Sequence, residues 1–136
     1  MTRDRAVVRY SILTILALGA CSSKDSSTAP QAASVAGVWK GPFLTDFGAT
    51  RYLHLNLTQG TDSVSGTCGF GDASDTIYYA CNAGGTFVNP NVTLTLTASG
   101  SAPLGLQGAL SNSTTIAGTL CCEAGLTNAA VTLTKQ

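Results

Sequence analysis

The chain has 136 residues, a formal net charge of zero, 15 glycines and 10% charged residues. This length suffices for one modest domain, so no second domain is needed. After residue 20 the only basic residues are Lys24, Lys40, Arg51 and Lys135, and they are scattered. This disfavours nucleic-acid binding, because a phosphate-reading surface needs clustered Lys and Arg. Threonines that alternate with Leu and Val favour strands over helices, so we expect almost no helix.

The first 21 residues have the layout of an export signal. Three arginines lie within the first nine residues, and residues 10–20 (YSILTILALGA) are apolar but too short to span a bilayer. Residues 18–21 (LGAC) then resemble the lipobox of bacterial lipoproteins. The resemblance implies cleavage before Cys21 and acylation of that cysteine. An ordinary secretory signal is the alternative.

This motif divides the chain into a lipoprotein signal peptide (1–20), a lipidated flexible tether (21–36) and a domain (37–136). Removing the first 20 of the 136 residues leaves 116, with four basic and six acidic residues. The tether is small, polar and contains Pro30, a composition that buries too little apolar surface to order itself. Ser22 after the cysteine favours, by family resemblance, outer-membrane sorting. We therefore expect a protein of the bacterial cell envelope whose partner is the membrane that holds its lipid anchor.

Eight extended segments follow, most of them separated by tight turns. Residues 51–59 alternate strictly between Leu and polar residues, as a half-buried strand does. The expected strands are residues 37–43, 51–59, 63–68, 84–88, 92–98, 104–110, 115–121 and 129–135, with a short additional strand at 77–79. A parallel sheet is excluded, because the connections leave no room for crossover helices. The pattern predicts an all-β fold, an antiparallel up-and-down barrel of about eight strands, with a closed sandwich as the alternative.

The first and last strands carry a second resemblance. Gly37-Val38-Trp39 resembles the G-x-W motif of lipocalins, in which the Trp plugs the closed end of the barrel. Lys135 has the parity of the apolar residues on the last strand, and the resemblance implies that it packs across Trp39 as a cation–π contact. We therefore expect the first and last strands to pair and close the barrel. The domain is also similar to small bacterial lipoproteins with lipocalin-like barrels.

Alternation assigns an apolar interior to the barrel. By the same alternation Gly66 lies on the apolar face, where a missing side chain allows strong coiling. The inward apolar residues are the candidate ligand-lining set: Phe43, Leu53, Leu55, Leu57, Leu94, Leu96, Leu106 and Leu133.

Four cysteines lie in the domain: Cys68, Cys81, Cys121 and Cys122. In an exported domain they indicate disulfides, with zinc as the minority alternative. Four cysteines allow three connectivities. We favour separate partners for Cys121 and Cys122, over a Cys68–Cys81 bond with a strained vicinal bridge.

Residues that could carry chemistry are few. His54 alternates with leucines, which places it on the outward face as a solvent-exposed histidine. Asp72 and Asp75 are three residues apart in a glycine-rich loop, a spacing too common to imply calcium. No paired carboxylates or nucleotide-binding loop appear. We therefore expect no enzyme activity, no metal and no cofactor.

Four aromatic residues surround the longest connection: Phe70, Tyr78, Tyr79 and Phe87. They form either a recognition patch or a lid over the core, and we favour the lid.

Together these features indicate a non-enzymatic, lipid-anchored barrel that binds a small apolar ligand or serves as a structural or interaction module. The alternative is an inhibitor of a lysozyme or protease that acts through a loop at the barrel mouth. An empty apolar interior would favour a carrier, and a rigid protruding loop on a filled barrel would favour an inhibitor.

Overall fold

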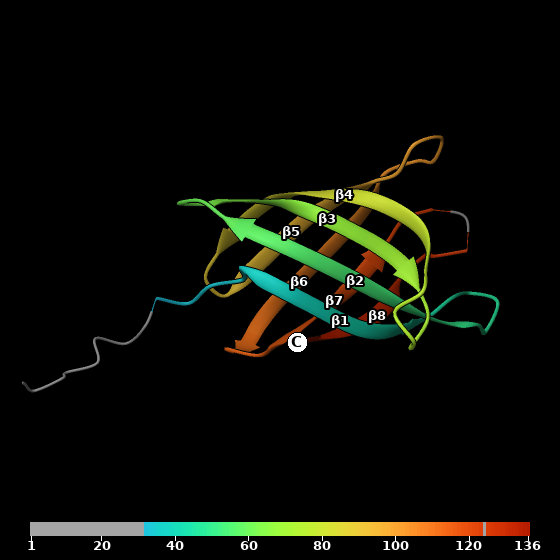
Figure 1. Cartoon of the computed structure of the whole chain (residues 1–136), viewed down its shortest axis with the longest axis horizontal. Helices are drawn as coiled ribbons and strands as arrows, with labels where there is room; N and C mark the ends of the chain where they lie inside the picture. The colour runs from blue at the N-terminus through green and yellow to red at the C-terminus, as the bar shows by residue number, and fades with distance from the viewer. Residues whose placement is uncertain (1–31, 124) are drawn as a thin grey trace, which may run out of the picture. The chain divides into compact units, whose positions relative to one another are not determined.

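The computed structural model describes residues 32–123 and 125–136, and it shows a closed antiparallel barrel (Figure 1). The strands are β1 (Gly37–Leu44), β2 (Thr50–Gln59), β3 (Ser63–Gly71), β4 (Ile77–Val88), β5 (Asn91–Thr97), β6 (Leu104–Asn112), β7 (Thr115–Cys121) and β8 (Ala129–Lys135). Each strand pairs with the next along the chain, and β8 pairs with β1. The predicted all-β, eight-stranded up-and-down barrel is confirmed. The predicted signal peptide, Cys21 and the tether up to residue 31 lie outside the described residues.

No helix within the described part of the chain is long and apolar enough to cross a membrane.

The β4 strand differs from its prediction. Two short strands at 77–79 and 84–88 were expected, whereas β4 is one continuous strand of 12 residues. The intervening residues are small or polar, so their alternation gives a weak signal. Backbone pairing with β3 nevertheless continues through them, with Cys68 opposite Cys81 and Gly66 opposite Ala83. Tertiary pairing therefore decides the conformation where local preference does not.

Leucine side chains fill most of the barrel interior. Leu53, Leu55 and Leu57 of β2 are almost fully buried, and they belong to the same core cluster as Leu94 and Leu106 of β5 and β6. An eight-stranded barrel is just wide enough for side chains to fill. The apolar area that these residues remove from water provides the main stabilisation of the fold.

The segment before β1 helps to seal one end of the barrel. Val35 is 0% exposed, and its carbonyl accepts a hydrogen bond of 2.8 Å from the indole nitrogen of Trp39. Its backbone N–H donates to Oε1 of Gln59, also at 2.8 Å. A flexible tether as far as residue 36 was expected, but Val35 is packed into the core. The apolar side chain of Val35 explains the difference, since burying it favours an ordered segment.

The closing pair lies at the same sealed end. Trp39 is opposite Lys135 in the β1–β8 register, and Nζ of Lys135 is 5.4 Å from the centroid of the indole ring. The backbone N–H of Gln136 also donates to the carbonyl of Val38 at 2.9 Å. The end that holds Trp39 is therefore the closed end of the barrel, and the opposite end is its mouth.

Candidate functional site at the barrel mouth

The mouth contains a cavity of about 760 Å³. It lies where the loops β1–β2, β3–β4, β5–β6 and β7–β8 gather, at the right-hand end of Figure 1. Its volume falls within the range of small-molecule pockets, about 300–1,000 Å³. The barrel is therefore filled in its closed half and hollow at its mouth.

Apolar side chains form the floor of the cavity. Phe43 of β1 and Phe70 of β3 contact each other edge to face, with ring centroids 5.9 Å apart and an interplanar angle of 84°. Leu96 and Leu104 contribute from β5 and β6 and are almost fully buried. Four different strands thus supply a continuous apolar surface under the opening.

The predicted ligand-lining set divides between cavity and core. Phe43 and Leu96 line the cavity. The other six residues are at most 2% exposed and fill the interior below it: Leu53, Leu55, Leu57, Leu94, Leu106 and Leu133. The reason is barrel size, since an interior this narrow is closed by leucine side chains and leaves free volume only at the mouth.

Arg51 and Tyr78 form one wall of the cavity. Arg51 lies at the start of β2 opposite Phe43, and its guanidinium carbon is 5.6 Å from the centroid of the Tyr78 ring. The β3–β4 pairing shifts register here, so that Phe70 faces Tyr79, Gly71 faces Ile77 and Tyr78 is the extra residue of a bulge. A bulge redirects the side chain that it carries. The alternation of apolar and polar residues in the sequence does not reveal this bulge, so the position of Tyr78 could not be predicted.

Hydrogen bonds hold Tyr78 in place. Its hydroxyl donates to Oδ2 of Asp72 at 2.7 Å. Oδ1 of Asp72 accepts from the hydroxyl of Ser74 at 2.6 Å and from the backbone N–H of Thr76 at 3.2 Å. The hydrogen bond from Ser74, followed by that from Tyr78, lowers the pKa of Asp72 to about 2. The same contact with Asp72 raises the pKa of Tyr78.

The aromatic lid that we expected is wrong for the two tyrosines. Tyr78 is 52% exposed and Tyr79 is 71% exposed, so they form a rim around the opening. Phe70 belongs to the cavity floor, and Phe87 is buried in the core away from the cavity. Because β4 is one long strand, Tyr78 and Phe87 lie near its opposite ends and cannot gather over one opening.

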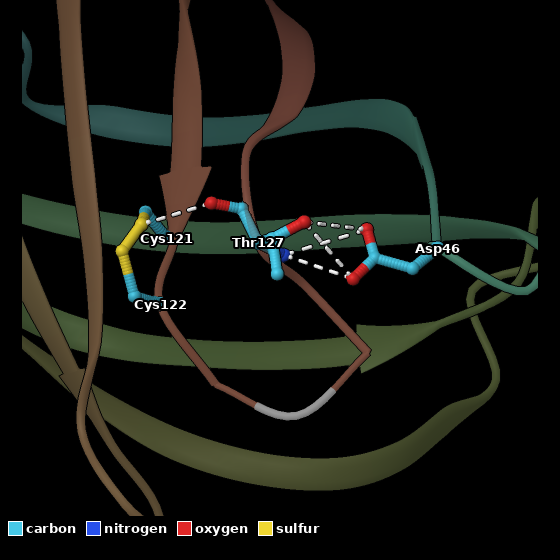
Figure 2. The surroundings of a disulfide bond; sticks show 4 residues. All are labelled: Asp46, Cys121, Cys122 and Thr127. Carbon is cyan, nitrogen blue, oxygen red and sulfur yellow. Dashed lines mark hydrogen bonds between the residues drawn. A yellow bond between two sulfur atoms is a disulfide. The ribbon is translucent and has the colours of Figure 1, made fainter.

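Two mouth loops are fastened to each other (Figure 2). The carboxylate of Asp46, in the β1–β2 loop, accepts hydrogen bonds from the backbone N–H and the hydroxyl of Thr127, both at 3.1 Å to Oδ2. The backbone N–H of Asp46 donates to the carbonyl of Gly125 at 3.0 Å. These bonds join the β1–β2 and β7–β8 loops on one side of the cavity.

The cysteines pair differently from the favoured prediction. Cys68 and Cys81 face each other across the β3–β4 hairpin, with Cα atoms 4.8 Å apart, and form a disulfide. Cys121, at the end of β7, is bonded to Cys122 beside Thr127 (Figure 2). Separate partners for Cys121 and Cys122 are therefore wrong. The reason is topological, since β7 lies between β6 and β8, across the barrel from the β3–β4 hairpin.

A polar cluster lies on the outer wall, outside the cavity. Lys40 of β1 forms an ion pair with Asp75 and also donates to the carbonyl of Ala73 at 2.6 Å. His54 faces outward as expected, but its side chain is only 16% exposed, because the β3–β4 loop folds over it. Within residues 32–123 and 125–136, no group of three or more His, Cys, Asp and Glu is placed to hold a metal ion.

Comparison with known proteins identifies the architecture. No protein-family model matches the chain, and no curated protein does either. The redesigned β-barrel mFAP1, bound to DFHBI, is similar with a TM-score of 0.60 at 10% identity, over 74% of this chain and 94% of that one. A de novo designed fluorescence-activating β-barrel is similar with a TM-score of 0.57 at 13% identity, over 74% and 93%. Another redesigned barrel, b11L5F_LGL, has a TM-score of 0.51 at 19% identity, over 74% and 90%. At these identities the likeness concerns the fold alone.

Proposed function

We propose that this protein is a non-enzymatic binding protein of the bacterial cell envelope, anchored by a lipid on Cys21, whose barrel mouth holds a small apolar molecule. The observation that carries the proposal is the cavity of about 760 Å³ above an apolar floor. Phe43, Phe70, Leu96 and Leu104 supply that floor, and an apolar ligand that covers them gains free energy in proportion to the area removed from water.

The surroundings of the cavity support binding in preference to catalysis. Glu123 is the one carboxylate among its described lining residues, and His54 lies on the outer wall. General acid–base chemistry needs a positioned pair of such groups within reach of a substrate. The designed barrel mFAP1 is described bound to DFHBI, so a barrel of this architecture can bind a molecule of that kind.

A neutral fluorescent probe tests the cavity. N-phenyl-1-naphthylamine should increase its fluorescence when titrated into the protein. Ala98→Trp places an indole into the lining and should weaken binding at least tenfold. Val88→Trp, at an exposed position on the outer surface, is the matched control and should bind normally. Absence of binding to the native protein, or equal binding by both variants, would contradict the proposal.

The lipid anchor is tested separately in a bacterial host. Radiolabelled fatty acid should be incorporated into the native chain and should be absent from Cys21→Ala. Membrane fractions should retain the native chain and release the variant. Equal labelling of the two chains would reject lipidation at this residue, with no bearing on the cavity.

A second candidate function, inhibition of a lysozyme or protease, is favoured by the β1–β2 loop. Phe47 at its tip is 86% exposed, and the loop is held by Asp46–Thr127 contacts and by a bond of 2.9 Å from the N–H of Thr45 to the carbonyl of Ala49. A rigid loop with an exposed aromatic anchor suits insertion into a partner's cleft. If this is the function, Phe47→Ala should abolish inhibition across a panel of lysozymes and proteases, whereas Val88→Ala should not.

A further inference from the structure

We infer that the mouth cavity selects single-chain amphiphiles with one anionic group, and that the guanidinium of Arg51 binds that group. This inference rests on the proposed function, because it names the ligand class of the same cavity. Arg51 has the parity of the inward leucines on β2, and it stands opposite Phe43 at the upper edge of the apolar floor. A cation therefore borders the apolar surface where a ligand would leave the floor and meet water.

No residue that the structure describes neutralises the charge of Arg51. In the described part of the chain, neither a hydrogen bond nor an ion pair engages its guanidinium. The Tyr78 ring, 5.6 Å away, gives a cation–π contact but accepts none of the five N–H donors. The Tyr78 ring limits the positions that the Arg51 side chain can adopt, because the hydroxyl of Tyr78 is held by its hydrogen bond to Asp72. Within residues 32–123 and 125–136, Arg51 is thus a partly oriented cation whose N–H donors are not engaged.

The other charges around the barrel make this position specific. Among the described residues, Lys40 is paired with Asp75 on the outer wall, and Lys135 packs on Trp39 at the closed end. Glu123 also lines the cavity, but it belongs to the connection between β7 and β8 and forms no ion pair with Arg51. Its carboxylate repels an anion on that side. The anionic group of a ligand is therefore directed to the Arg51 side of the mouth.

The ligand's chemistry follows from these two parts. A guanidinium presents a planar fork of donors that matches a carboxylate or a phosphate bidentately. The floor of Phe43, Phe70, Leu96 and Leu104 suits a hydrocarbon chain. Both a fatty acid and a single-chain phosphate ester have this combination, so the experiment includes one of each.

Competition for the neutral probe measures the selectivity. The competitors are dodecanoate, monododecyl phosphate and dodecanol, each used below its micelle concentration. Each is titrated against N-phenyl-1-naphthylamine bound to the native protein and to three variants, Arg51→Gln, Arg51→Lys and Lys40→Gln. At least one anion should compete about tenfold better than dodecanol, which equals about 1.4 kcal/mol. Arg51→Gln should remove that advantage and leave dodecanol unchanged, and Arg51→Lys should keep part of it. Lys40→Gln makes the same charge change on the outer wall and should preserve the full ratio.

The outcomes separate the two proposals. Equal competition by the anions and the alcohol, or an anion preference that persists in Arg51→Gln, would overturn the role of Arg51 while the cavity remained a binding site. Failure of the neutral probe to bind the native protein would overturn the proposed function, and this inference with it. Circular dichroism of each variant checks that the barrel is intact.

Discussion

The mouth of the barrel depends on single capping side chains, and Asp72 is one whose hydrogen bonds require the ionised carboxylate. Its pKa is lowered from 3.8 to about 2, first by the hydroxyl of Ser74 and then by that of Tyr78. A carboxylate whose folded pKa is depressed stabilises the folded state above its unfolded pKa of about 4, and this contribution is lost as the pH falls towards about 2. Acid should therefore loosen the wall that holds Tyr78 and Arg51.

We expect the midpoint of thermal unfolding to fall between pH 4 and pH 2, and Asp72→Asn to reduce that fall by lowering stability at neutral pH. Asn112→Ala is the matched control. The amide of Asn112 accepts hydrogen bonds from the N–H and the hydroxyl of Thr114, both at 2.9 Å, so it caps another turn without titrating. This variant should be less stable at every pH with an unchanged slope. An identical pH profile for the native protein and Asp72→Asn would contradict the prediction.

At the scale of elements, the close approach of neighbouring strands makes two adjacent glycines differ. A Cβ atom on Gly85 of β4 would lie 1.9 Å from the carbonyl oxygen of Thr93, whereas a Cβ atom on Gly84 would meet nothing within 4 Å. Backbone cannot move aside as a flexible side chain can, so the β4–β5 pairing must distort around the first substitution.

Gly85→Ala should therefore lower the free energy of unfolding by about 1–3 kcal/mol. Gly84→Ala should leave it unchanged or raise it by about 0.4–1 kcal/mol, because alanine restricts the unfolded chain. Urea unfolding of the two variants measures the difference. Equal stabilities would mean that the strands separate easily at this point of the barrel.

Strand alternation accounts for how much of these elements the sequence could predict. The strands with regular apolar alternation, such as β2, β7 and β8, were placed to within one residue. The central part of β4 was missed, because Cys81 and Ala83 carry little apolar signal and their pairing with β3 is a tertiary effect. The observed disulfide partners were only the less favoured alternative for a related reason, since they depend on which strands are neighbours and on register. Strand parity alone predicts neither the neighbours of a strand nor its register with them.

For the molecule as a whole, the sequence indicated the closed end more clearly than the mouth. Trp39 and Lys135 were matched through the resemblance of Gly37-Val38-Trp39 to the lipocalin motif, supported by strand parity and chain direction, and they meet in the structure. The wall of Arg51 and Tyr78 depends on a bulge and on a loop cap at Asp72, which strand periodicity cannot reveal. The division of the interior into a filled half and a hollow mouth depends on three-dimensional packing, so it could not be predicted from the sequence either.

Closure of the barrel by β8 should decide whether the protein stays monomeric. In the closed barrel, β1 and β7 both have their outer backbone groups paired with β8. A chain that stops after Asn128 would expose those two edges and also lose Val131 and Leu133 from the core. Unpaired strand edges pair readily with other chains. We expect this truncated protein to elute as oligomers in size-exclusion chromatography and to lose cooperative unfolding.

A synthetic peptide of residues 129–136, added during refolding, should restore the monomer. A peptide of the same composition with Val131 and Leu133 moved to outward positions should not. A monomeric truncated protein with cooperative unfolding would show that the seven remaining strands close or stabilise the sheet without β8.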